Sequence, residues 1–119
     1  KEFSAREGIV AYGYDDKYKE YQRILQFVRI YLFNPSSGLY TCPLAMTDGA
    51  SCLIKNMKES GDLDKFEPEV KAQLEEAYKR LTSRNPSEFW TSGQWMTEVR
   101  GGSDVSGAAA TYALKEKGQ

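Results

Sequence analysis

The chain has 119 residues, of which 40% are hydrophobic and 28% charged, and its formal net charge is −1. This composition is typical of at most one globular domain and indicates neither disorder nor a fibrous repeat, and the net charge offers no electrostatic footprint for nucleic acid or an anionic membrane. No apolar run approaches the ~20 residues of a membrane-spanning helix, and no signal peptide is recognisable. The chain starts at Lys1 rather than at a methionine, and it stops at Gln119 within what looks like a sheet, so we expect both ends to be cut.

The first predicted helix is apolar on two sides. Lys1–Tyr14 shows no sustained period and is expected to be irregular, after which Asp15 or Asp16 caps a helix that runs to about Phe33. A helix that is apolar on two faces is expected to lie between neighbouring elements. One stripe comprises Tyr21, Ile24, Leu25, Val28, Tyr31 and Leu32, and the other Phe27, Ile30 and Phe33.

Two further helices follow, each after a turn. The run 34–38 (Asn-Pro-Ser-Ser-Gly) breaks the chain, and residues 39–57 are predicted to be helical, with Pro43 tolerated in the first turn. Ser60-Gly61-Asp62 is predicted to be a turn, and Pro68 opens the third helix. Its apolar face comprises Val70, Leu74, Ala77, Tyr78 and Leu81.

β-Favouring residues dominate after Asn85-Pro86. Thr91–Thr97 is one candidate strand and Ala108–Lys115 another. The sequence therefore predicts an α+β organisation, with three helices followed by the start of a sheet.

Histidine is absent and only Cys42 and Cys52 are present. Without histidine, catalytic triads, imidazole bases and most zinc or iron sites are excluded. If both cysteines lie on one helix, a rise of ~1.5 Å per residue separates them by ~15 Å, too far for a disulfide. We expect two buried, reduced thiols in an intracellular, reducing compartment; cytoplasm, peroxisome and mitochondrion are not distinguished.

A glycine-rich turn follows the first candidate strand, within residues 93–105. The Gly101-Gly102 pair lets backbone N–H groups approach a bulky planar or anionic ligand. The run is neither a P-loop nor a dinucleotide fingerprint, and by shape alone an ordinary capped turn stays open. Trp95 and Met96 could lie against a flavin ring, and Thr97 could offer a donor to its polar edge.

The residues around this turn resemble a known family. The run M-T-E-x-x-G-G-S-D-V (96–105), together with T-C-P-L-A-M-T-D-G-A (41–50), resembles the acyl-CoA dehydrogenase superfamily, and more narrowly the branch of the bacterial alkylation-response flavoprotein AidB and its fungal relatives. The resemblance covers nearly the whole chain. It implies that residues 1–88 are the C-terminal part of an N-terminal helical domain, and that residues 89–119 begin the middle β-barrel domain.

The resemblance implies an FAD-dependent oxidoreductase that introduces an α,β-double bond into acyl-CoA thioesters. The matching flavin contacts are Met96, Thr97, Gly102 and Ser103, with Gln94 and Trp95 as weaker candidates. The candidate contacts to the acyl-CoA thioester are Ser103, Ser37 and Thr41, although a helix of small and apolar residues such as 39–57 is more often plain core. No catalytic residue is expected here, because the family's carboxylate base lies in a C-terminal helical domain. The full-length protein is expected to be a homo-oligomer, and its electron acceptor stays open.

One departure leaves an alternative function open. Val99 and Gly101 stand where most members of the superfamily have proline and alanine. This favours the AidB-like branch, a flavoprotein of the DNA alkylation response that binds DNA through a region absent from this chain. A helical interaction module without a cofactor is a third alternative.

Overall fold

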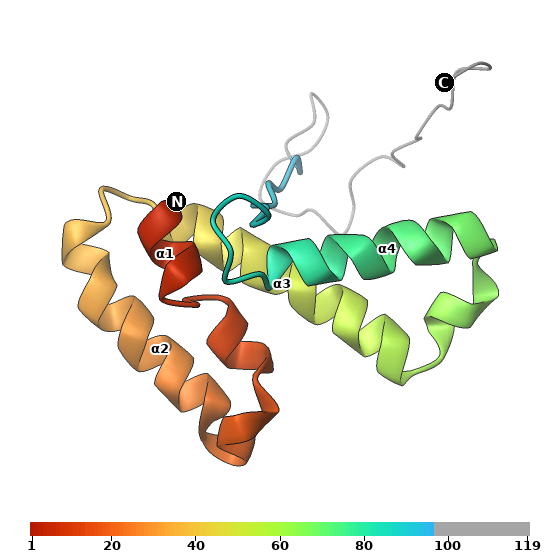
Figure 1. Ribbon diagram of the computed structural model, residues 1–119, viewed down its shortest axis with the longest axis horizontal. Helices are drawn as coiled ribbons and strands as arrows, with labels where there is room; N and C mark the ends of the chain where they lie inside the picture. The colour runs from red at the N-terminus through yellow and green to blue at the C-terminus, as the bar shows by residue number, and fades with distance from the viewer. Residues whose placement is uncertain (97–119) are drawn as a thin grey trace.

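Four α-helices organise the part of the chain that the computed structural model describes, residues 1–96. They are α1 (Glu2–Arg6), α2 (Gln22–Phe33), α3 (Thr41–Glu59) and α4 (Pro68–Leu81). The longest, α3, runs through the middle of the molecule, with α1 and α2 near its N-terminal half and α4 returning alongside its C-terminal half (Figure 1). The structure therefore has a helical body built on both ends of α3.

The predicted strands are not confirmed. No strand is present in residues 1–96, and Thr91–Met96 has neither helical nor strand structure. This corrects the expected strand Thr91–Thr97 over its described length. A strand is defined by hydrogen bonds to a neighbouring strand, and none is available within residues 1–96. The second candidate, Ala108–Lys115, lies outside the described residues.

The N-terminal segment is more regular than its sequence predicts. It contains α1 and a 3₁₀-helix, Ala11–Tyr14, where an irregular lead-in is expected. Ala5, Ile9 and Val10 are at most 2% exposed. Periodicity misses these elements because four or five residues are too short to establish a helical period.

The predicted helix from Asp16 to Phe33 is divided near its start. Lys19 has φ 45° and ψ −127°, and a separate 3₁₀-segment, Asp16–Tyr21, precedes α2. Asp15 caps the 3₁₀-segment, since its carboxylate accepts the Lys17 N–H at 3.1 Å, but α2 itself begins after Tyr21 without a side-chain cap. The apolar periodicity thus continues through this break in the helix, and the sequence pattern does not indicate the break.

The prediction for α3 is accurate to two residues at each end, and that for α4 is accurate at its start. Leu39 has φ 71° and lies outside α3, which begins at Thr41 rather than Leu39 and ends at Glu59 rather than Met57. Gly61 follows in the left-handed conformation, φ 77°, which only glycine adopts at little cost. Pro68 is the first residue of α4, as predicted.

Two small hydrophobic cores flank α3. The first consists of Ala5, Ile9, Val10, Leu44 and Phe89, with Tyr14, Ile30, Phe33 and Tyr40 packed against it. The second consists of Ile54, Leu63 and Leu81, with Ala50, Met57, Leu74, Ala77 and Tyr78. The first core joins four segments that are far apart in the sequence, and Phe89 brings the chain beyond α4 back to α3.

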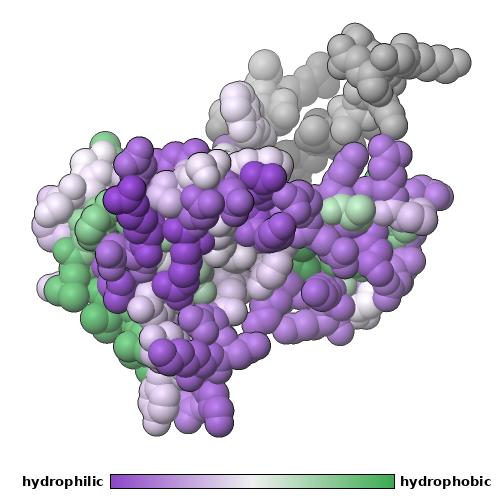
Figure 2. All heavy atoms as spheres, in the orientation of Figure 1, coloured by the Kyte–Doolittle hydropathy of each residue, from purple (hydrophilic) through white to green (hydrophobic). Residues whose placement is uncertain are grey.

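The longer apolar stripe of α2 lies at the surface. Its residues Tyr21, Ile24, Val28, Tyr31 and Leu32, together with Phe27 from the second stripe, are each between 48% and 77% exposed. Figure 2 shows hydrophobic atoms gathered on the side of the molecule that α2 forms. Ile30 and Phe33 instead pack against the first core. Within residues 1–96, the core therefore covers Ile30 and Phe33 of the second stripe, while Phe27 and most of the longer stripe stay exposed.

The cysteines are unpaired but not both buried. Cys42 is exposed and Cys52 is half-buried, so the expectation of two buried thiols is wrong, most clearly for Cys42. Among residues 1–96, no helix is long and apolar enough to cross a membrane. The same residues contain no group of three or more acidic or cysteine side chains that could bind a metal ion.

Candidate functional site

The segment that leads to the predicted flavin residues is anchored to the helical body. Phe89 is 2% exposed in the first core. The next residue, Trp90, donates its backbone N–H to the carbonyl of Arg80 at 3.2 Å, and the Arg80 guanidinium lies 5.4 Å from the centre of the Trp90 ring. One apolar contact, one hydrogen bond and one cation–π contact thus hold residues 89 and 90 against the helical body.

A second attachment joins this segment to the middle of α3. The backbone N–H of Ser92 donates to Oγ1 of Thr47 at 3.0 Å. Thr47 is fully buried, and its hydroxyl donates in turn to the carbonyl of Pro43 at 2.7 Å. Because a hydroxyl has one proton and two lone pairs, Thr47 can make both bonds at once. The helix side chain therefore fixes the backbone of a segment 45 residues away.

The predicted flavin contacts that the structure describes are on the surface just beyond this attachment. Gln94 is exposed, Trp95 is 93% exposed and Met96 is 48% exposed. The large apolar side chains at these positions are thus not covered by residues 1–96. Thr97, Gly102 and Ser103 lie outside the described residues.

The two predicted substrate contacts, Ser37 and Thr41, meet at the connection between α2 and α3. Ser37 Oγ donates to the carbonyl oxygen of Asn34 at 2.9 Å, and Thr41 Oγ1 donates to the side-chain oxygen of Asn34 at 2.7 Å. Both residues are half-buried. No hydrogen bond within residues 1–96 links this pair to Gln94, Trp95 or Met96.

A polar cluster that the sequence does not predict lies between α2 and α3. We call it the Asp48 cluster, and it consists of Tyr14, Arg23, Gln26 and Asp48. Oδ1 of Asp48 accepts hydrogen bonds from the Tyr14 hydroxyl at 2.9 Å, Arg23 at 2.8 Å and Gln26 at 3.0 Å. Arg23 also lies 4.6 Å from the centre of the Tyr14 ring. Burial raises the pKa of Tyr14 above its ordinary value, and Asp48 raises it further. The cluster joins the N-terminal segment, α2 and α3.

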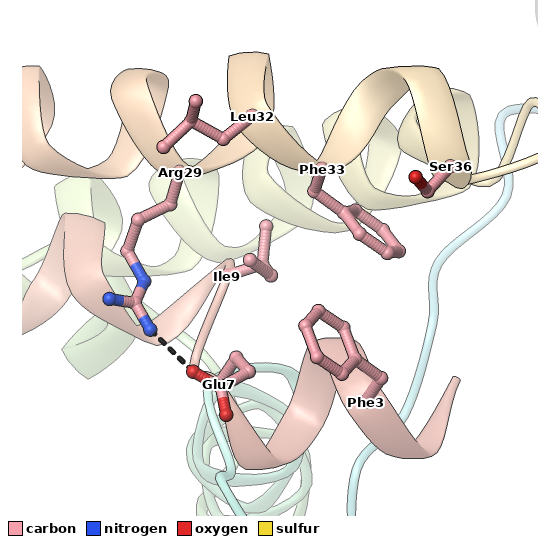
Figure 3. Close-up of a pocket in the computed structure, with 7 residues that line it drawn as sticks. All are labelled: Phe3, Glu7, Ile9, Arg29, Leu32, Phe33 and Ser36. Carbon is pink, nitrogen blue, oxygen red and sulfur yellow. Dashed lines mark hydrogen bonds and ion pairs between the residues drawn. The ribbon is translucent and has the colours of Figure 1, made fainter.

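A cavity of about 290 Å³ lies between α1 and α2 (Figure 3). Phe3 and Phe33 stack there with ring centres 5.3 Å apart, and Arg29 pairs with Glu7 at 2.7 Å. The other lining residues are Ile9, Leu32 and Ser36. The lining includes none of the predicted flavin or substrate contacts, so we do not assign this cavity to the site.

Comparison with known proteins supports the acyl-CoA dehydrogenase superfamily. No family model matches the chain. Its helical fold is nevertheless that of a segment of an acyl-CoA dehydrogenase: the crystal structure of Caenorhabditis elegans ACDH-11 in complex with C11-CoA matches it with a TM-score of 0.77 and 43% identity, over 97% of this chain and 18% of that one.

The sequence comparison identifies a relative of the same kind. Acyl-CoA dehydrogenase family member 11 of Caenorhabditis elegans is 45% identical over 117 residues, which are 97% of this chain and 18% of that protein. The chain thus spans less than a fifth of the length of the relatives it matches. The AidB-like branch stays a prediction.

Proposed function

We propose that this chain is one segment of an FAD-dependent, acyl-CoA dehydrogenase-like oxidoreductase, and that it forms one wall of the flavin and acyl-CoA site. The observation that carries the proposal is the similarity over 97% of the chain to a protein whose crystal structure is in complex with C11-CoA. The run 96–105, which resembles the flavin-contacting signature, lies within this chain. In this proposal, residues 1–88 complete a helical domain and residues 89–119 begin a β-domain.

The described residues fit a wall for a planar cofactor. Trp95 and Met96 present exposed apolar side chains directly after a segment that is fixed at Phe89 and Ser92. An anchored backbone with uncovered apolar side chains is what a large, flat ligand requires on one side. When bound, FAD would supply the two-electron acceptor for the substrate hydride.

The role of this chain in the proposed reaction is to bind and orient. Trp95 and Met96 would cover the ring system and exclude water from it, while Gln94, Thr97, Gly102 and Ser103 would supply polar or backbone contacts. Ser103, Ser37 and Thr41 are the proposed contacts to the acyl-CoA thioester. The carboxylate that removes the α-proton would come from outside residues 1–119, so we assign no catalytic residue. We further propose that the full-length protein is a homo-oligomer. We also propose that it resides in a reducing compartment, and the unpaired Cys42 and Cys52 support this second proposal.

The proposal is tested with the full-length protein that contains this segment. The purified protein is freed of oxygen and mixed with acyl-CoA thioesters of increasing chain length while the flavin absorbance is recorded. Rapid loss of absorbance with one chain-length class is the expected result. A bound flavin that no thioester reduces would instead favour the AidB-like alternative, and a protein without flavin would refute the proposal.

A further inference from the structure

We propose that Thr47 is a positioning residue for the flavin-contacting segment, acting through the backbone of Ser92. The inference rests on the proposed function, because the segment it positions is assigned to flavin there. Thr47 lies on α3 and touches none of the predicted flavin contacts through a hydrogen bond within residues 1–96. Its role would be to fix the place from which Gln94, Trp95 and Met96 extend.

The first argument is the geometry of the Thr47 hydroxyl. It is 0% exposed, so water does not compete for it. Its proton is directed to the Pro43 carbonyl at 2.7 Å, which leaves its lone pairs free to accept the Ser92 N–H at 3.0 Å. Without Oγ1 of Thr47, that N–H would lose its partner among residues 1–96. A donor left unsatisfied in a partly buried place is costly, so the segment would move to restore the bond elsewhere.

The second argument is the length of chain that this bond restrains. Among the described residues, Ser92 is the last attachment before the predicted flavin contacts, and Trp90, bonded to the Arg80 carbonyl, is the preceding one. From Ser92 to Met96 the chain advances four residues, whereas from Trp90 it advances six. At ~3.3 Å per extended residue, loss of the bond lengthens the unrestrained segment from ~13 Å to ~20 Å. A displacement of about 1 Å is already enough to disturb a ligand site.

Ser51 provides a matched control on the same helix. It is also 0% exposed, and its hydroxyl donates to the Thr47 carbonyl at 2.8 Å. This bond stays within α3 and reaches no other segment. S51A and T47V therefore each remove one buried hydroxyl from α3, and only T47V releases Ser92.

The experiment uses the full-length protein and measures FAD affinity, the flavin reduction potential and the melting temperature of four variants. We expect T47V to bind FAD about 5- to 10-fold more weakly, the effect of losing one hydrogen bond. T47S, which restores Oγ, and S51A are expected to stay within about twofold of the wild type by the same reasoning. S92P removes the bond from the donor side without altering α3, and must reproduce the T47V defect even if T47V itself fails to fold.

The outcomes separate this inference from the function on which it rests. If the wild type binds FAD and both T47V and S92P bind it equally well, the inference is overturned while the proposed function stands. If T47V and S51A lower the melting temperature and FAD affinity alike, Thr47 is only a core residue and the inference is again overturned. A wild type that binds no FAD overturns both.

Discussion

Replacing Asp48 by alanine should destabilise the chain more than replacing any exposed carboxylate. Oδ1 of Asp48 is a shared acceptor for Tyr14, Arg23 and Gln26, at 2.8 to 3.0 Å. The Tyr14 hydroxyl also donates to the Asp48 carbonyl at 2.7 Å. Truncation would leave the Nε2 donor of Gln26, a residue 1% exposed, with only a long contact of 3.4 Å to the Val10 carbonyl, while Oε1 could still accept from Arg23 at 2.7 Å.

The magnitude follows from these contacts. A hydrogen bond to a charged group contributes about 1.5–3 kcal/mol. The three bonds share one oxygen, so their contributions do not add. The side chain of Asp48 is 24% exposed and that of Arg23 is 35% exposed, and solvent screens their ion pair. We therefore expect D48A to cost about 2–3 kcal/mol, or roughly 10 °C in melting temperature for a domain of this size. D48N keeps an acceptor oxygen and should cost about half as much.

The assay is thermal and urea unfolding of the 119-residue chain, followed by circular dichroism at two low protein concentrations. D64A is the matched control, because Asp64 is 71% exposed and its single ion pair is with Lys71 at 2.7 Å. Such a pair contributes at most about 1 kcal/mol. If D48A and D64A destabilise the chain equally, the Asp48 cluster is not the stabilising feature inferred from its geometry.

Three further predictions concern pH, association and activity. Burial raises the pKa of Tyr14 above the value of about 10 that it has in the unfolded chain. The contribution of Tyr14 to stability is therefore present below pH ~10 and is lost as the pH rises further. Urea unfolding at alkaline pH should then show a smaller loss of stability for Y14F than for the wild type. The isolated chain should self-associate through the exposed apolar face of α2. The double variant F27E/Y31E should shift its sedimentation towards the monomer, whereas L53E, at an exposed position on α3, should not. A wild type that stays monomeric at high concentration would contradict this prediction. Finally, the chain alone should not turn over acyl-CoA thioesters, and measurable turnover would show that the carboxylate base is not elsewhere.

The sequence predicts the helices that carry their own local signals. Residues 41 to 59 form α3 within two residues of the predicted bounds, and α4 begins at Pro68 as predicted, because proline and glycine mark where a helix can start or end. The break at Lys19 has no such signal, since lysine with positive φ is imposed by the surrounding structure. The predicted strand lacks a partner within residues 1–96, and no local pattern can supply one.

Burial on α2 shows why periodicity does not identify a buried face. Gln26 is 1% exposed, while its neighbour Phe27 is 63% exposed. The apolar pattern shows which positions carry hydrophobic side chains. Which of these side chains are buried depends on the elements that pack against the helix. In residues 1–96 the helix meets the first core with Ile30 and Phe33, and it meets Asp48 with Gln26. Gln26, a polar residue between the two apolar stripes, is the one local sequence feature that hints at the Asp48 cluster.

Three residues of the run 41–50 stabilise the fold, whereas Thr41, in the same run, is a proposed substrate contact. Leu44 enters the first core, Thr47 accepts the Ser92 N–H and Asp48 organises Tyr14, Arg23 and Gln26. Their spacing of i, i+3 and i+4 places these three residues on one side of α3. Each contacts segments far away in the sequence, so the run specifies how α3 gathers the chain. In the proposed function, flavin contacts come from residues within 94–103, and Thr47 links α3 to the start of that segment through Ser92.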